Sequence, residues 1–138
     1  MQTRVTHILS VEYPVLSAGI PVIGVDLVAS VSNAGGLGIL GATYLSPAEI
    51  HARATAIRER TTRPFALNFL VPFSSDEHYA ACVDAGVPVL STAWGAADAA
   101  AVSPDDAAGV ADVAGWAGVA AGVLSGWFGS VIKKQNPR

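Results

Sequence analysis

Short apolar runs alternate with longer amphipathic segments along the first 95 residues of the chain. The apolar runs are rich in branched residues and recur around positions 15, 38, 67 and 90. Runs of this length are typical of buried strands and too short for stable helices. The expected strands are 13–18, 37–40, 65–70 and 88–92.

Helix signals lie between these runs. Ser46 is a natural N-cap, Pro47 suits the first helical position, and Glu49 completes a capping box with Ser46. Ser74 and Glu77 repeat the capping-box spacing further along the chain. The expected helices are 25–31, the segment that follows Ser46, and 76–85.

Strand and helix therefore alternate, which indicates an α/β fold with parallel strands and right-handed crossovers. About four strand-helix units fit into residues 1–95. Two architectures satisfy this pattern: a closed eight-unit barrel and an open doubly wound sheet.

The composition changes after Trp94. Residues 96–138 are dominated by alanine and glycine, and we expect a helical or irregular tail there. The stretch 113–132 has no charged residue and is long enough to cross a bilayer, although its glycine and alanine make it only moderately apolar. Three explanations of this tail are open: membrane contact through 113–132, an altered reading frame and a truncated gene.

Charge and cysteine content narrow the function classes. Charged residues form only 14% of the chain, which indicates extensive burial, an uncovered partner surface or membrane contact. A net charge of -3 gives no electrostatic basis for a nucleic-acid partner. Cys82 is the single cysteine, so neither a disulfide framework nor a zinc cluster is expected, and a reducing cytoplasm is the expected location.

Residues 36–41 match the dinucleotide fingerprint G-x-G-x-x-G. That fingerprint should follow a strand and open a helix. Here it follows an expected helix and contains an expected strand. We therefore interpret these glycines as a helix stop followed by a tightly packed strand.

Four segments, taken together, resemble the nitronate monooxygenase family of flavoproteins, also called 2-nitropropane dioxygenase-like proteins. They are Tyr13–Leu16, Val28–Gly38, Tyr44–Pro47 and Pro64–Phe69. The resemblance covers about residues 3–95 and implies the amino-terminal half of a TIM (β/α)8 barrel. It also implies FMN at the carboxyl ends of the strands and oxidation of alkyl nitronates by O2. FMN-dependent enoyl-acyl-carrier-protein reductases share the early motifs and remain an alternative.

The resemblance also implies which residues contact the cofactor. Ala18, Gly19 and Ile20 match a segment of the family that lies along the flavin at the end of the first strand. Asn68 matches an asparagine of the third strand that contacts FMN. A carboxamide both donates and accepts, which suits the mixed polar edge of a flavin. The competing interpretation is a strand-end asparagine that bonds its own backbone.

No catalytic or metal-binding residue is assigned. The catalytic histidine and the phosphate loops of the family belong to later strands, and nothing after Trp94 matches them. His7, His51 and His78 do not align with the catalytic position. We therefore expect the isolated chain to bind FMN weakly or not at all. A non-catalytic fragment, or a half-barrel that needs a partner or a second copy, is the alternative.

Overall fold

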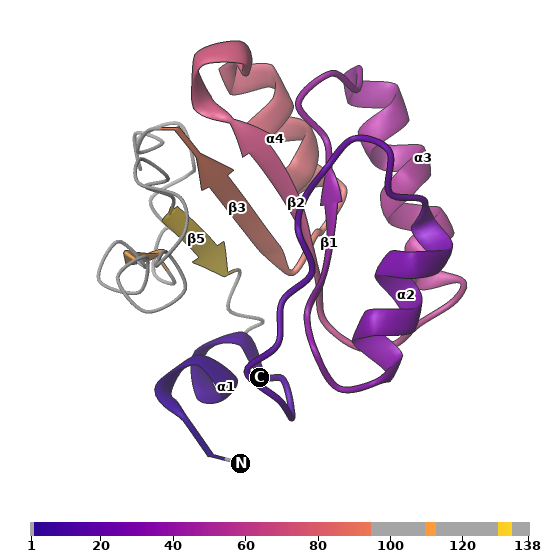
Figure 1. The fold of residues 1–138 in the computed structure, drawn as a ribbon. Helices are drawn as coiled ribbons and strands as arrows, with labels where there is room; N and C mark the ends of the chain where they lie inside the picture. Colours follow the sequence, from indigo (N-terminus) through magenta and orange to yellow (C-terminus); the bar gives the residue numbers. More distant parts are fainter. Residues whose placement is uncertain (1, 95–109, 113–129, 134–138) are drawn as a thin grey trace.

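The protein is described here by a computed structural model, which places residues 2–94, 110–112 and 130–133. Three parallel strands form one side of the sheet: β1 (Gly38–Gly41), β2 (Phe65–Leu70) and β3 (Val89–Ala93). They lie side by side in chain order, as Figure 1 shows. The parallel alternation predicted from the sequence is confirmed.

Helices connect these strands. They are α1 (Arg4–Leu9), α2 (Val25–Asn33), α3 (Pro47–Arg58) and α4 (Asp76–Asp84), with a short 3-10 helix, η1 (Val71–Phe73), after β2. The expected helices α2, α3 and α4 are present. Helix α1 was not predicted from the sequence.

One face of the sheet packs against α2, α3 and α4. Leu67 and Phe69 point to this face, because side chains alternate along a strand. The helices contribute further fully buried members: Val28 from α2, Ile50, Ala54 and Ile57 from α3, and Cys82 from α4. All three crossover helices share one core, whereas a doubly wound sheet would carry helices on both faces. The arrangement favours the barrel over the open sheet.

The opposite face of the sheet is covered by α1 at the amino ends of the strands (Figure 1). Val5 and Leu9 are buried there. Their partners are Leu37, Ile39, Ala66 and Val89. This second cluster occupies the position of a barrel interior, and α1 closes its lower end.

Of the two capping boxes predicted from the sequence, the one at α3 is present and the one at α4 lies one residue further along. At α3 the hydroxyl of Ser46 accepts from the amide of Glu49 at 3.4 Å, and the Glu49 carboxylate accepts from the Ser46 amide at 2.8 Å, as predicted. At α4 the prediction was wrong by one residue, since Ser75 is the N-cap and pairs with His78. The hydroxyl of Ser74 instead donates to the Leu70 carbonyl at 3.0 Å, where it closes the turn after β2.

The first expected strand, 13–18, is reduced to a single parallel bridge between Leu16 and Leu37. The Leu37 amide donates to the Val15 carbonyl at 2.9 Å and the Ser17 amide donates to the Leu37 carbonyl at 3.0 Å. The next ladder bond is missing because the amide of Ile39 donates to the hydroxyl of Ser17, at 2.8 Å. A serine side chain thus ends the pairing that the apolar pattern predicted.

Two further strands lie in the tail. β4 (Val110–Asp112) and β5 (Ser130–Lys133) pair antiparallel, and β5 extends the sheet by pairing antiparallel with β3. The expectation of a helical or irregular tail did not include them, and most of 96–138 lies outside the described residues. Residues 113–129 of the segment considered as a membrane span also lie outside the described residues. Among the placed residues, no helix has the length and apolar character needed to cross a bilayer.

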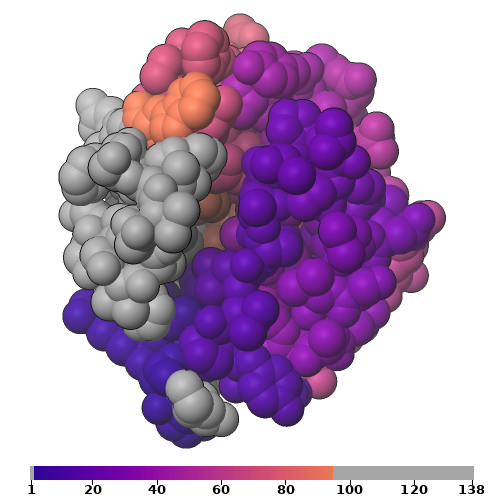
Figure 2. Space-filling view, in the orientation of Figure 1, coloured from indigo at the N-terminus to yellow at the C-terminus, as the bar shows by residue number. Residues whose placement is uncertain are grey.

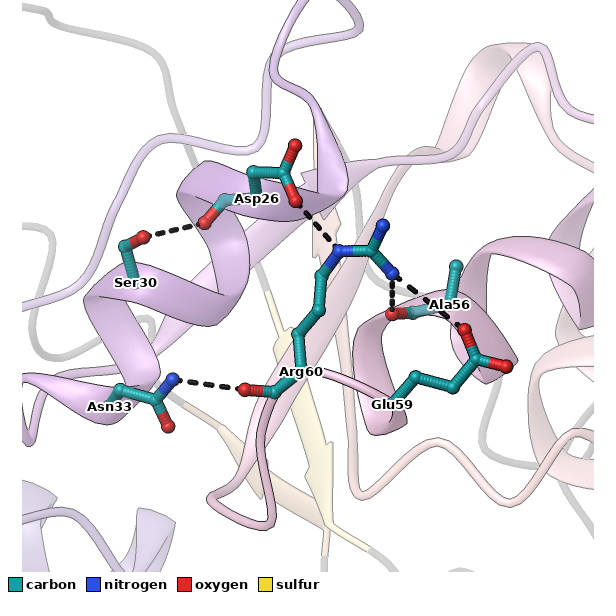
Figure 3. A network of polar contacts seen from close by, with 6 residues as sticks. All are labelled: Asp26, Ser30, Asn33, Ala56, Glu59 and Arg60. Atoms are coloured by element: carbon teal, nitrogen blue, oxygen red, sulfur yellow. Dashed lines mark hydrogen bonds and ion pairs between the residues drawn. The ribbon is translucent and has the colours of Figure 1, made fainter.

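Polar side chains tie α2 to the end of α3 (Figure 3). Arg60 forms an ion pair with Asp26 at 2.7 Å, and the Asn33 amide nitrogen donates to the Arg60 carbonyl at 3.0 Å. The buried hydroxyl of Thr61 donates to the Asn33 carboxamide oxygen at 2.6 Å. This network fixes the turn from which β2 begins.

Candidate functional site

The inner face of the sheet becomes polar at the carboxyl ends of β2 and β3. Asn68 of β2 lies directly opposite Ser91 of β3 in the parallel ladder. The Ser91 hydroxyl donates to the carboxamide oxygen of Asn68 at 3.0 Å. Asn68 is 9% exposed, so the pair lies at the edge of the solvent. In α/β barrels this end of the strands carries the functional site.

Gly19 packs directly on Asn68. A methyl group at Gly19 would lie 2.5 Å from Cβ of Asn68 and 2.9 Å from Cγ2 of Ile39, closer than carbon atoms can approach. A methyl group at Gly41 would lie 2.7 Å from the carbonyl carbon of Ile20. The segment that contains Gly19 and Ile20 therefore crosses the carboxyl end of β1 in close contact, and only glycines allow this approach.

The structure thus brings together some of the expected cofactor residues. Gly19 and Asn68 are in contact, and Ala18 and Ile20 flank Gly19 with exposed side chains. The Asn68 side chain bonds Ser91 and not its own backbone, which contradicts the competing interpretation of this residue. Its amide nitrogen has no hydrogen-bond partner among the placed residues.

Aromatic residues that the sequence analysis did not assign also mark this end of the sheet. Tyr44, Phe73 and Trp94 follow β1, β2 and β3, and all three are exposed. The rings of Phe73 and Trp94 meet edge to face, with centroids 6.2 Å apart. Figure 2 shows the residues around the end of β3 (orange) on the surface, next to pink atoms of the preceding part of the chain. The signal available in the sequence was one aromatic residue shortly after each strand.

The histidines and the single cysteine of the placed residues lie on helices and not on the strands that carry Asn68 and Ser91. His7 is on α1 at the opposite end of the sheet, His51 is exposed on α3, and His78 caps α4. Cys82 is buried among apolar residues, and burial raises the pKa of its thiol to about 12, so it is not a nucleophile. Within the described residues, His, Cys, Asp and Glu side chains form no group that could hold a metal ion.

The glycines of the dinucleotide-like match have a packing role. A methyl group at Gly38 would lie 2.0 Å from the carbonyl oxygen of Val28, so β1 approaches α2 at this glycine. This contact agrees with the interpretation of residues 36–41 as a helix stop followed by a packed strand.

A surface cavity of about 350 Å³ lies at the other end of the sheet. It is lined by residues that precede β2 and β3, among them Arg58, Thr62, Arg63 and Gly86. Arg63 is paired with Glu12, and Arg58 donates to the Ala85 carbonyl. In this fold the amino ends of the strands serve stability, so the cavity is not the candidate site.

Similarity to known proteins agrees with this geometry. A protein of Staphylococcus saprophyticus named probable nitronate monooxygenase is 45% identical over 80 residues, 57% of this chain and 22% of the relative. A Staphylococcus aureus protein of the same name is 40% identical over 72 residues, 51% of this chain and 20% of the relative. The chain thus spans about a fifth of the length of these relatives.

Solved structures show the same fold. FabK from Thermotoga maritima superposes with a TM-score of 0.65 and 30% identity, over 75% of this chain and 33% of that protein. A nitroalkane oxidase from Streptomyces ansochromogenes superposes with a TM-score of 0.63 at 23% identity, over 72% of this chain and 38% of that protein. These enzymes are TIM barrels, so the predicted partial barrel is confirmed. The sequence model of the nitronate monooxygenase family matches residues 2–88, and the chain belongs to that family.

Proposed function

We propose that this chain forms one wall of the flavin site of an FMN-dependent nitronate monooxygenase. The wall consists of Ala18, Gly19, Ile20 and Asn68. The observation that carries the proposal is the contact between Gly19 and Asn68 at the carboxyl ends of the strands. Membership of the nitronate monooxygenase family supports the reaction class that we propose, the oxidation of alkyl nitronates by O2.

The residues fit a planar ring with a polar edge. Gly19 has no side chain that would hold a ring away from Asn68, and the exposed side chains of Ala18 and Ile20 offer apolar contact. The Asn68 amide group supplies a hydrogen-bond donor at the border of this surface.

Bound FMN would supply the electron chemistry, taking electrons from the anionic nitronate and returning them to O2. The placed residues of this chain bind and orient the ring. His7, His51 and His78 lie on α1, α3 and α4, and we assign none of them as a base for proton transfer. The single thiol, Cys82, is buried and is expected to stay reduced in a cytoplasmic setting.

The first experiment is purification of the 138-residue chain followed by a flavin absorbance spectrum. We expect weak FMN binding or none, because the placed residues include no glycine-rich phosphate loop at this end of the sheet. A stoichiometric yellow protein would contradict that expectation.

Nuclear magnetic resonance titration reaches weaker binding than absorbance does. We expect riboflavin, which carries the ring without the phosphate, to shift the amide signals of Gly19, Ile20 and the Asn68 side chain. A matched titration of the Asn68→Ala variant should show smaller shifts at Gly19 and Ile20. Shifts confined to other parts of the protein would contradict the assignment of this wall.

An FMN-dependent enoyl-acyl-carrier-protein reductase relative is the alternative of the same cofactor class. Nitronate-dependent O2 consumption and enoyl-thioester-dependent NAD(P)H oxidation separate the two. We expect neither activity in the isolated chain above the free-flavin background.

A further alternative is that two copies of the chain pair as half-barrels. Gel filtration tests this pairing, and a strictly monomeric folded species would contradict it.

A further inference from the structure

We propose that Ser91 is a positioning residue that sets the direction of the Asn68 carboxamide. The site then presents a hydrogen-bond donor and selects a ligand edge that accepts. The identity of that ligand as a flavin ring rests on the proposed function. The orientation of the carboxamide does not depend on it.

The register of the sheet places the two side chains together. Asn68 and Ser91 are direct partners in the parallel ladder between β2 and β3. The Ser91 hydroxyl donates to the Asn68 carboxamide oxygen at 3.0 Å. Because the oxygen and the nitrogen of a carboxamide lie on opposite sides of its carbon, holding the oxygen toward β3 turns the nitrogen away from β3.

Packing restricts the other movements of this side chain. Gly19 lies so close that even one added carbon would overlap Cβ and Cγ of Asn68, at 2.5 and 3.0 Å. The neighbouring backbone donors are already satisfied, since the Ala42 amide donates to the Asn68 carbonyl at 2.9 Å. The Leu70 amide donates to the Thr43 hydroxyl at 2.9 Å. With these backbone donors occupied, the Ser91 hydroxyl is the group that holds the carboxamide, and in the structure it does so through the carboxamide oxygen.

The amide nitrogen of Asn68 is left to an external partner. It has no hydrogen bond to a placed residue, and it is not among the buried polar atoms without a partner, so it reaches solvent, where a ligand can accept its hydrogen bond. A donor at this point matches the carbonyl oxygens and unprotonated ring nitrogens of an oxidised isoalloxazine. It does not match the N–H group of the same ring, which needs an acceptor.

The test compares three variants with the unmodified chain. Ser91→Ala removes the hydroxyl, and Ser91→Thr keeps it. Ser30→Ala is the matched control, because the Ser30 hydroxyl also makes one hydrogen bond, to the Asp26 carbonyl at 2.7 Å, on the exposed side of α2. The first readout is the side-chain amide signal of Asn68 in the ligand-free protein, with its chemical shifts and order parameter. The second is the relative affinity for riboflavin.

We expect Ser91→Ala to shift the Asn68 side-chain signals, to lower their order parameter and to weaken riboflavin binding roughly threefold to tenfold. Ser91→Thr should restore both readouts, and Ser30→Ala should change neither. The proposal is wrong if Ser91→Ala leaves the Asn68 amide signals and order parameter unchanged, or if Ser91→Thr behaves like Ser91→Ala. If the amide signals respond as expected but Asn68→Ala binds riboflavin like the unmodified chain, positioning by Ser91 stands and the flavin assignment fails.

Discussion

Gly19 is the residue whose size matters most at the candidate site. Its replacement by alanine would place a carbon 2.5 Å from Cβ of Asn68, and that atom cannot move without moving β2. We expect Gly19→Ala to lower the free energy of unfolding by about 1–3 kcal/mol, the usual cost of overpacking. Urea unfolding measures it.

Gly24→Ala is the control for this substitution. No atom lies within 4 Å of the position that its methyl group would take, and its backbone conformation is open to any residue. Loss of a glycine N-cap and the reduced entropy of the unfolded chain roughly offset each other, so we expect a change within about 0.5 kcal/mol. Equal effects of the two substitutions would contradict the close contact at Gly19.

Cys82 gives a pH-dependent prediction at the same scale. Burial raises the pKa of its thiol to about 12 in the folded protein, from an ordinary value near 9. The folded state then holds its proton where the unfolded state releases it, so stability is complete below pH 9 and falls as the pH rises from 9 toward 12.

Urea unfolding between pH 8 and pH 11 tests this prediction by comparing the unmodified chain with Cys82→Ala. The alanine variant should be less stable at pH 8 because of the cavity, and the difference should shrink by up to about 1 kcal/mol per pH unit above pH 9. A difference that stays constant to pH 11 would mean that the thiol is not shielded. A shielded Cys82 thiol should also be alkylated slowly in the folded protein at pH 8.

At the scale of elements, α3 is the helix with the clearest end signals in the sequence. Its capping box satisfies two orphan amides at the amino end, and the bonds from Ser46 hold the pKa of the Glu49 carboxyl below its usual value. We expect Ser46→Ala to lower the free energy of unfolding by about 1 kcal/mol at pH 7. The pKa of Glu49 is lower in the folded protein than in the unfolded chain, so its carboxylate stabilises the fold fully only above the unfolded pKa. This contribution to the free energy of unfolding should disappear as the pH falls through the folded pKa.

Thr55→Ala is the control for the cap. Thr55 is exposed in the interior of the same helix, and alanine has the higher helix propensity, so this variant should be unchanged or slightly more stable. If Ser46→Ala proved as stable as Thr55→Ala in urea, the cap would have no role in the stability of the fold.

The elements that the sequence predicted are those with explicit end signals. α1 was not expected because its box pairs Thr3 with Thr6, where the usual signature has Glu or Gln, and it ends at Ser10 with a left-handed φ of 55° instead of at glycine. The expected strand at 13–18 became a bridge because the side chain of Ser17 took the next ladder donor. Local side-chain bonds of this kind compete with regular structure and leave no apolar pattern.

At the scale of the whole molecule, the candidate site depends on contacts between distant segments. Asn68 was expected from the family motif, but its partner Ser91 was not, because the register between β2 and β3 is set by three-dimensional packing. The contact of Gly19 with Asn68 likewise depends on how the chain crosses the end of β1. The family resemblance therefore pointed to Gly19 and Asn68, and the structure shows how these two residues meet Ser91.

The closure of the barrel interior by α1 gives the last prediction. Leu9 is 5% exposed and packs with Leu37, Ile39, Ala66 and Val89. Leu9→Ala should lower the free energy of unfolding by about 2–5 kcal/mol, because it opens a cavity at the lower end of the inner face. Urea unfolding of the full chain measures this loss.

His7→Ala is the control, since His7 is exposed on the same helix, and its replacement should leave stability nearly unchanged. If α1 were only a surface attachment, Leu9→Ala would cost less than about 1 kcal/mol and the inner cluster would survive without it. A loss in the expected range, with His7→Ala unaffected, would mean that α1 is part of the fold. The inner face would then be closed at its amino end, and the end that carries Asn68 would be the one left for a ligand.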